Sequence, residues 1–160
     1  MTKTPARRPT DRLADCLWLA RLVEKVRLHL AGELDKDFQM PFGNRRATDG
    51  IFLEHFGLTK DEIIEAVRAA GEDDEQVATW FLQRVQEANE KIARWNKIAF
   101  QLGRPGLPGE RVLSWAKKNL YKNGDDPRVD SIFRMIAADE GYLEQMIAAE
   151  EAANSSAALK

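Results

Sequence analysis

Apolar residues recur at helical spacing through most of this chain. In its middle part they follow one another at intervals of three or four residues, which places them on one face of a helix about 29 residues long. The residues of this face are Val77, Phe81, Val85, Ala88, Ile92, Trp95, Ala99 and Leu102. No stretch alternates apolar and polar residues for long enough to build a sheet. The pattern therefore predicts an all-α fold, a single-domain bundle of about five helices with one long central helix.

Terminating residues set the expected ends of the helices before this central one. A first helix begins near Thr10 or Asp11 and ends at Ala31, because Gly32 readily ends a helix. Its core stripe contains Leu13, Cys16, Ala20, Val23, Val26 and Leu30. A short extended segment is expected next, in which every second residue is apolar: Phe38, Met40 and Phe42. A short helix then covers residues 49–56.

Capping signals mark the remaining helices. Thr59 and Glu62 have the spacing of a capping box and predict the start of the helix that precedes the central one. After the central helix, another helix is expected over residues 110–121. The Asp126-Pro127 pair opens the last helix, since Asp caps and Pro fits the first helical position. This helix is expected to fade within residues 152–160, where Ala and Ser dominate.

Size and composition fit one soluble globular domain. The chain has 160 residues, of which 44% are apolar and 31% charged. We expect the domain to cover residues 8–150, with flexible tails at residues 1–7 and 151–160. The longest unbroken apolar run, Cys16 to Ala20, is too short to cross a bilayer, and no signal-peptide pattern precedes it. The expected location is the cytoplasm, with no role at a membrane.

Charge is unevenly distributed along the chain. The whole chain has a formal net charge of −2, which gives no reason to expect nucleic-acid binding. Residues 1–46 carry a net charge of +4, however, and the remainder carries −6. From Ala137 onward there are five carboxylates and no cation before Lys160. This asymmetry favours docking of the last helix near the basic first part, although an acidic surface helix in contact with water has the same composition.

One face of the first helix carries cations beside an aromatic ring. At about 100° per residue, the residues Ala14, Trp18, Arg21, Lys25 and His29 fall within roughly an 80° arc opposite the core stripe. Arg21 and Lys25 suit a phosphate or carboxylate, and Trp18 suits a planar ligand. The alternative is that the long stems of the cations lie along neighbouring helices while their charged ends reach water.

The last helix carries a carboxylate where an apolar residue is expected. Its apolar stripe contains Val129, Ile132, Phe133, Ile136, Leu143 and Ile147, and Glu140 lies within about 20° of the centre of this stripe. A buried carboxylate needs a partner or takes up a proton, so we expect Glu140, with Asp139, to meet cations of the first helix. These cations are Arg21, Lys25 and Arg27. Three alternatives stay open: a purely structural ion pair, a polar pocket, and a helix break at Gly141 that leaves Glu140 in water.

The sequence lacks the usual motifs of metal-binding and cofactor-binding sites. The two histidines, His29 and His55, and the single Cys16 do not have the spacing of a zinc site. The phosphate-binding patterns GxGxxG and GxxxxGKS/T and the hydrolase turn GxSxG are also absent. We therefore expect no metal and no cofactor, and Cys16, which falls on the apolar stripe, is expected to be inert.

A series of short motifs resembles the bacterial domain-of-unknown-function family 5069 over roughly residues 8–145. The motifs are Arg8-Pro9, Leu19-Ala20-Arg21, Lys25 with Arg27, Ala31-Gly32, Phe56-Gly57-Leu58, Asp74-Glu75, Val77 with Trp80, Trp95-Asn96 and Asp139-Glu140-Gly141. The resemblance implies a mostly helical cytoplasmic domain and no assigned activity. Its charged elements, Lys25, Arg27, Asp139 and Glu140, are among those that the spacing argument pairs.

Two departures from this family pattern concern local shape. After Gly32 the family pattern has a Gly-Glu-Tyr segment, whereas this chain has Asp35 to Phe38. Between Trp80 and Trp95 the pattern has a break that contains proline, whereas residues 84–93 of this chain have the pattern of continuous helix. The middle of the chain is therefore expected to differ in shape.

The sequence favours a helical binding or interaction module with a charged site between the first and last helices. The expected ligand-binding residues are Arg21, Lys25, Arg27, Asp139 and Glu140. The expected partner is a small anionic or polar ligand, or a protein. The alternative is a small-molecule enzyme with Glu140 as general acid or base, the one catalytic residue that the pattern suggests. Whether the chain is an enzyme and whether it forms a homo-oligomer are both left open by the sequence.

Overall fold

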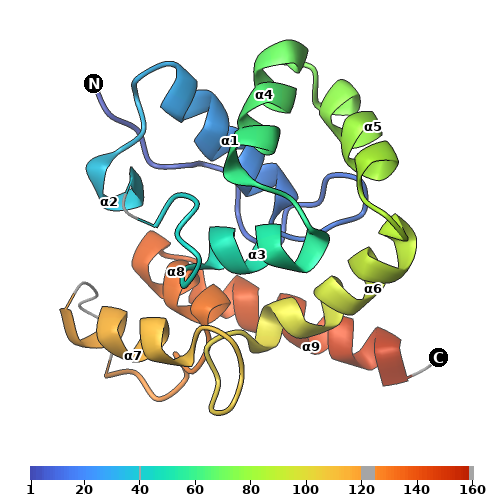
Figure 1. Ribbon diagram of the computed structural model, residues 1–160. Coiled ribbons are helices and arrows are strands. Elements are labelled where there is room, and N and C mark those ends of the chain that lie inside the picture. Colours follow the sequence, from blue (N-terminus) through green and yellow to red (C-terminus); the bar gives the residue numbers. More distant parts are fainter. Residues whose placement is uncertain (40, 120–124, 159–160) are drawn as a thin grey trace. The chain divides into compact units, whose positions relative to one another are not determined.

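The structure is a computed structural model that describes residues 1–39, 41–119 and 125–158. Within these ranges the chain forms nine α-helices and one short 3-10 helix, and no strand (Figure 1). The elements are α1 (Leu19–Leu30), α2 (Lys36–Gln39), α3 (Thr48–Phe56), α4 (Lys60–Ala70), α5 (Asp74–Arg84), α6 (Ala88–Ile98), η1 (Ala99–Gln101), α7 (Glu110–Asn119), α8 (Ile132–Glu140) and α9 (Leu143–Ala158). The all-α class is confirmed. The predicted number of about five helices is wrong, because the predicted central and last helices are each two helices and α2 replaces part of a predicted extended segment.

The chain divides into two compact units, Met1–Lys97 and Ile98–Lys160. In the first unit, α1 packs on α4, and α4 packs on α5. In the second unit, α8 packs on α7, α9 and η1. No helix in the described part of the chain is both long enough and apolar enough to span a membrane.

The first helix begins at Leu19 rather than near Thr10. Ala14, Asp15 and Trp18 have positive φ values of 54°, 59° and 74°, so residues 14–18 form turns instead of helix. Asn96 of α6 holds these turns through side-chain hydrogen bonds: its Oδ1 accepts from the Leu17 N–H, and its Nδ2 donates to the Asp15 carbonyl. Contacts with a distant helix therefore replace the helical hydrogen bonds that the apolar pattern predicts here.

The predicted central helix is broken at residues 85–87, which corrects the expectation of one continuous helix. Glu87 has a positive φ of 53°, and α6 starts at the next residue. The ring of Phe52 on α3 lies 6.2 Å from that of Phe81 on α5 and 5.2 Å from that of Trp95 on α6. In one straight helix the Cα atoms of Phe81 and Trp95 are about 21 Å apart, too far for one ring to contact both. The break lets both helices pack on the same aromatic residue.

The predicted last helix is also two helices. Ser131 caps α8 by accepting a hydrogen bond from the Arg134 N–H, so the observed cap lies five residues after the predicted cap, Asp126. Gly141 ends α8 in the left-handed conformation, with a φ of 88°, and α9 begins at Leu143. A stripe calculated for one continuous helix therefore does not apply across Gly141.

The features that are set by residues close together in the sequence agree better with the predictions. The capping box of Thr59 and Glu62 is present in full, and Gly57 ends α3 in the left-handed conformation. The predicted extended segment is instead the short helix α2, which contains Phe38, while Met40 lies outside the described residues. The predicted end of the helix over residues 110–121 also lies outside them.

Candidate functional site

Two of the predicted site residues, Arg21 and Lys25, lie one turn apart on α1 and are both buried. Arg21 is 1% exposed and Lys25 is 4% exposed. Charged side chains are rarely so deeply buried unless their charges are compensated. Their ends therefore do not reach water in the way that the alternative interpretation of this face expects.

Lys25 forms an ion pair with Asp49, a residue in the first turn of α3. The Lys25 Nζ donates to both Asp49 carboxylate oxygens, at 3.2 and 3.1 Å, and both side chains are buried. The indole Nε1 of Trp18 donates to Asp49 Oδ1 at 2.9 Å. This carboxylate thus connects the start of α3 to α1 and to the turn before α1.

The backbone before α3 sets the position of Asp49. A Cβ atom on the next residue, Gly50, would overlap the carbonyl oxygen of Asn44 and lie 2.5 Å from the Cα of Arg45. Only glycine lets the loop approach the first turn of α3 this closely. The positive end of the α3 dipole also stabilises a carboxylate in this turn.

Two aromatic rings complete the surroundings of the cations. The Lys25 Nζ lies 4.8 Å from the centroid of Trp18 and 5.7 Å from that of Phe38. The Arg21 Cζ lies 5.8 Å from both centroids. All four distances are within the range of cation–π attraction. We call Trp18, Arg21, Lys25, Phe38 and Asp49 the α1 cluster.

The sequence predicted part of the α1 cluster. Helical spacing brought Trp18, Arg21 and Lys25 to one face, and the structure brings the same three together even though Trp18 precedes the helix. The Trp18 ring is 1% exposed, so it packs against the cations instead of offering a face to a planar ligand. Asp49 and Phe38 were missed. The sequence predicted a short helix over residues 49–56, but no sequence signal indicates which helix the Asp49 carboxylate faces.

An extended segment before α1 also contacts the α1 cluster. The Arg21 NH1 donates to the main-chain carbonyl of Arg7 at 2.8 Å, and the Arg7 N–H donates to Glu24 Oε1 at 2.7 Å. Pro5 and Pro9, on either side of Arg7, are buried. Residues 1–7 were expected to be a flexible tail, and Arg7 is anchored on α1 through these contacts.

Arg27 belongs to a different cluster from Arg21 and Lys25. Its NH1 lies 2.7 Å from Asp74 Oδ1, and the Arg7 NH2 lies 2.6 Å from Asp74 Oδ2. The Arg27 Nε also donates to the Gly71 carbonyl. Partial burial raises the pKa of Asp74, but hydrogen bonds and positive charges from Arg7 and Arg27 outweigh it, so that the pKa of this carboxyl is lowered. Asp74 is therefore charged and bridges two arginines.

The other two predicted residues, Asp139 and Glu140, lie in the second unit. They are the last two residues of α8, where Asp139 is exposed and Glu140 is half-buried. Because α8 ends at Gly141, Glu140 does not lie in the middle of a continuous apolar stripe as predicted. Both residues lie at the C-terminal end of α8, where the negative end of the helix dipole disfavours a carboxylate.

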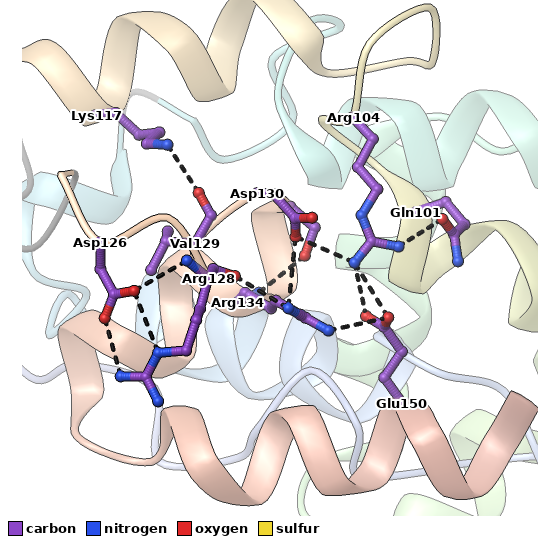
Figure 2. A network of polar contacts seen from close by, with 10 residues as sticks. Gln101, Arg104, Lys117, Asp126, Arg128, Val129, Asp130, Arg134 and Glu150 are labelled. Carbon is purple, nitrogen blue, oxygen red and sulfur yellow. Dashed lines mark hydrogen bonds and ion pairs between the residues drawn. The ribbon is translucent and has the colours of Figure 1, made fainter.

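A polar network in the second unit was not predicted (Figure 2). The Glu150 carboxylate on α9 is buried and accepts from Arg104 NH2 at 3.2 and 3.1 Å and from Arg134 NH2 at 3.3 Å. Asp130 also pairs with Arg104, at 3.1 Å. Burial lowers the pKa of Arg104, but hydrogen bonds and ion pairs with Asp130 and Glu150 outweigh it and raise the pKa. These contacts attach α9 to α8 and to the loop before α7.

The potential metal ligands and the thiol among the described residues are dispersed or buried. No group of three or more His, Cys, Asp or Glu side chains in the described ranges is arranged to hold a metal ion. Cys16 is buried, and burial raises the pKa of its thiol far above its usual value. The thiolate, which is the nucleophilic form of cysteine, is therefore not populated at neutral pH.

Comparisons with known proteins give a family but no function. Residues 3–142 match the family described as Domain of unknown function (DUF5069). No curated protein and no solved structure matches the chain.

Proposed function

The chain belongs to the DUF5069 family, and we propose from its own geometry that it is a helical binding module for a small anionic molecule. The proposed ligand-binding residues are Arg21 and Lys25. The observation that carries the proposal is the burial of these two cations one turn apart, beside two aromatic rings and Asp49. Arg27, Asp139 and Glu140, which the sequence also suggested, remain predictions.

The energetics of buried charge support a functional role for the α1 cluster. Replacing a buried ion pair with apolar residues of similar volume is often neutral or stabilising, so stability alone does not explain why such a pair is present. Charged groups that are shielded from water are also characteristic of binding and catalytic sites. The Lys25–Asp49 pair is shielded in this way, with its side chains 5% and 1% exposed.

One hydrogen bond of Arg21 supports an anionic rather than a neutral ligand. The acceptor of its NH1 is the neutral main-chain carbonyl of Arg7. A carboxylate or phosphate oxygen in the same place makes a charge-assisted hydrogen bond, which is about twice as strong as one to a neutral acceptor. The planar guanidinium group also donates two parallel hydrogen bonds to such anions. At the position of this carbonyl an anion therefore binds more strongly than a neutral polar molecule.

A thermal-shift screen of small carboxylates and phosphates tests this proposal. A ligand at about 100 times its dissociation constant stabilises the folded state by about 2.7 kcal/mol. For a chain of this length such a gain raises Tm by roughly 5–10 °C. The absence of any such shift across the panel would overturn the proposal and favour a protein partner instead.

Variants identify the site of any ligand found in the screen. Arg21→Met is expected to abolish the ligand-induced shift. Because this substitution also removes the hydrogen bond to Arg7, a second variant, Lys25→Met with Asp49→Leu, removes both charges of the buried pair together. Arg68→Met, at an exposed ion pair on α4, is the matched control and is expected to keep the full shift. A shift that persists in folded forms of both site variants places the ligand elsewhere and contradicts the proposal.

A further inference from the structure

The exposed side of α7 carries an aromatic ring between two cations. Trp115 is 49% exposed. Arg111 lies four residues before it and Lys118 three residues after it, and both are exposed. Residues at these spacings are neighbours on the surface of a helix. The apolar residues Leu113 and Ala116 of the same helix are buried, and α7 packs on α8. We call Arg111, Trp115 and Lys118 the α7 face.

The two cations of the α7 face are not neutralised within the second unit. The other arginines of this unit, Arg104, Arg128 and Arg134, all form ion pairs with acidic side chains of the same unit. Among the residues that the structure describes, neither Arg111 nor Lys118 forms an ion pair. Their charges are therefore available to an anion from outside the chain.

Positive charge is concentrated in this part of the sequence. Residues 111–122 contain four basic residues and no acidic one. The rest of the second unit contains four basic and nine acidic residues, a net charge of −5. The net charge of the whole chain, −2, conceals this local excess. Because salt screens exposed charges beyond about 10 Å, local charge rather than net charge decides whether an anion binds to α7.

The composition of the α7 face favours a single-stranded nucleic acid over a protein or a membrane. The centres of protein interfaces are poor in charged residues and especially in lysine. A helix that lies in a membrane surface has a broad apolar face, whereas Trp115 is the only large apolar side chain exposed within residues 110–119. Proteins that bind single strands combine an exposed aromatic ring, on which one base stacks, with cations that contact the phosphates.

The length of the α7 face agrees with this class of partner. Arg111 and Lys118 are seven residues apart, which is about 10 Å along the helix axis. A stacked strand has one phosphate for about every 3.4 Å of its length, so the face spans about three nucleotides. The Trp115 ring lies between the two cations along the helix, where a base can stack while the cations contact phosphates on either side of it.

We propose that the α7 face binds single-stranded RNA or DNA, with a base stacked on Trp115 and with phosphates at Arg111 and Lys118. This site goes beyond the proposed function, because it lies in the second unit and contains no residue of the α1 cluster. Stacking is sequence-tolerant, since every base has a π face. The site therefore recognises an unpaired strand by its chemistry and selects little among base sequences.

Fluorescence anisotropy of the full chain with end-labelled oligouridylate and oligodeoxythymidylate tests the proposal, with strands of about 12 nucleotides. Trp115→Ala is expected to weaken binding at least about fivefold, because it removes the stacking surface. Trp115→Phe keeps a ring and is expected to keep most of the affinity. Binding is also expected to quench the fluorescence of Trp115, so that this quenching disappears in Trp115→Phe while binding persists.

The salt dependence of binding tests the two cations. With two phosphate contacts, a rise from about 50 to about 200 mM salt is expected to weaken binding to a single strand about sevenfold. Arg111→Gln and Lys118→Gln are each expected to halve the slope of log Kd against log salt. Arg94→Gln on α6 and Leu82→Ala on α5, at exposed positions in the first unit, are the matched controls and are expected to leave affinity and slope unchanged.

Three outcomes would overturn this inference. One is that neither oligonucleotide binds at the lower salt concentration. Another is that Trp115→Ala binds the strands as tightly as the wild type does, which shows attraction of a polyanion without stacking. The third is that polyglutamate binds more tightly than both oligonucleotides and loses affinity in Trp115→Ala, which assigns the α7 face to an acidic protein segment. None of these outcomes affects the proposed site at Arg21 and Lys25.

Discussion

Lys25 and Asp49 form a buried ion pair in which the Lys25 ammonium lies 3.1 and 3.2 Å from the two carboxylate oxygens. The pair joins α1 to α3 in the first unit, and the Trp18 indole makes a third contact to the same carboxylate. Lys25 therefore has two expected roles: it is a proposed ligand-binding residue, and it holds α1 and α3 together.

Removal of one member of this pair is expected to be much more damaging than removal of both. Lys25→Met alone leaves the Asp49 charge buried, and we expect it to lower the free energy of unfolding by about 3–5 kcal/mol. In the double variant with Asp49→Leu no charge remains, and the main loss is the acceptor of the Trp18 indole, about 1–3 kcal/mol. Urea denaturation of the wild type, the two single variants and the double variant forms a double-mutant cycle, which measures the coupling energy between Lys25 and Asp49.

The exposed Arg68–Glu65 pair on α4 provides the matched control for this cycle. Its coupling energy is expected to be about 0–1 kcal/mol. Additive losses in the Lys25 and Asp49 variants, with no more coupling than in the control, would show that the buried pair does not act as a unit.

Gly50→Ala is expected to displace Asp49 and to destabilise the first unit. The new Cβ atom would meet main-chain atoms of Asn44 and Arg45, which cannot move aside as a flexible side chain does. We expect a loss of at least about 2–3 kcal/mol, in the range of overpacking. Gly57→Ala is the control: its Cβ meets nothing within 4 Å, and only the positive φ of 70° opposes it, at about 1–2 kcal/mol. Thermal or urea unfolding of the two variants distinguishes steric overlap from backbone strain.

The break between α5 and α6 predicts opposite effects for two nearby glycine substitutions. Glu87 has a φ of 53°, which glycine adopts without strain. Glu87→Gly is therefore expected to be neutral or to stabilise the chain by up to about 1 kcal/mol. Glu90→Gly, inside α6, is expected to cost about 1 kcal/mol. Equal losses at the two positions in urea denaturation would instead support one continuous helix.

Protonation of the Asp74 carboxyl is expected to lower the stability of the protein in acid. Its pKa is lowered in the folded state by Arg7 and Arg27, against the effect of partial burial. A lowered folded-state pKa contributes stability that is fully present above the unfolded value, about 3.9 for Asp, and is lost as the pH falls through the folded value. In Asp74→Asn the loss of unfolding free energy between about pH 5 and pH 3 is therefore expected to be smaller than in the wild type. An identical pH dependence in the two proteins would contradict the pairing of Asp74 with the arginines.

In the second unit, Glu150 is expected to be the most sensitive acidic position. Glu150→Gln removes the buried charge that Arg104 and Arg134 share, and the two partly buried arginines then keep Asp130, whose side chain is 50% exposed, as a shared acidic partner. We expect a loss of about 3–5 kcal/mol in unfolding free energy. Glu151→Gln, at the exposed neighbouring residue, is the control and is expected to change stability by less than about 0.5 kcal/mol. Similar losses for the two variants would refute the role of the network.

Features that depend on residues close together along the chain could be predicted from the amino-acid sequence alone. The Thr59–Glu62 capping box, the end of α3 at Gly57 and the burial of Cys16 are all observed as predicted. Apolar spacing also identified core residues correctly where it misjudged the helix: Val77, Phe81, Ile92 and Trp95 are all buried on either side of the break. Caps and burial are set by local hydrogen bonding and by side-chain polarity, which the sequence contains directly.

The tertiary structure alone decided where helices break and which charges meet. A straight helix through Glu87 satisfies the apolar period as well as a bent one does, whereas the contacts of Phe52 and Phe56 with residues of both helices favour the bend. Helical spacing likewise placed Arg21 beside Lys25, but the partners Asp49 and Arg7 come from segments that have no regular spacing to α1. Periodicity describes one element at a time, whereas the free energy of a buried charge depends on whatever other elements bring within a few ångströms of it.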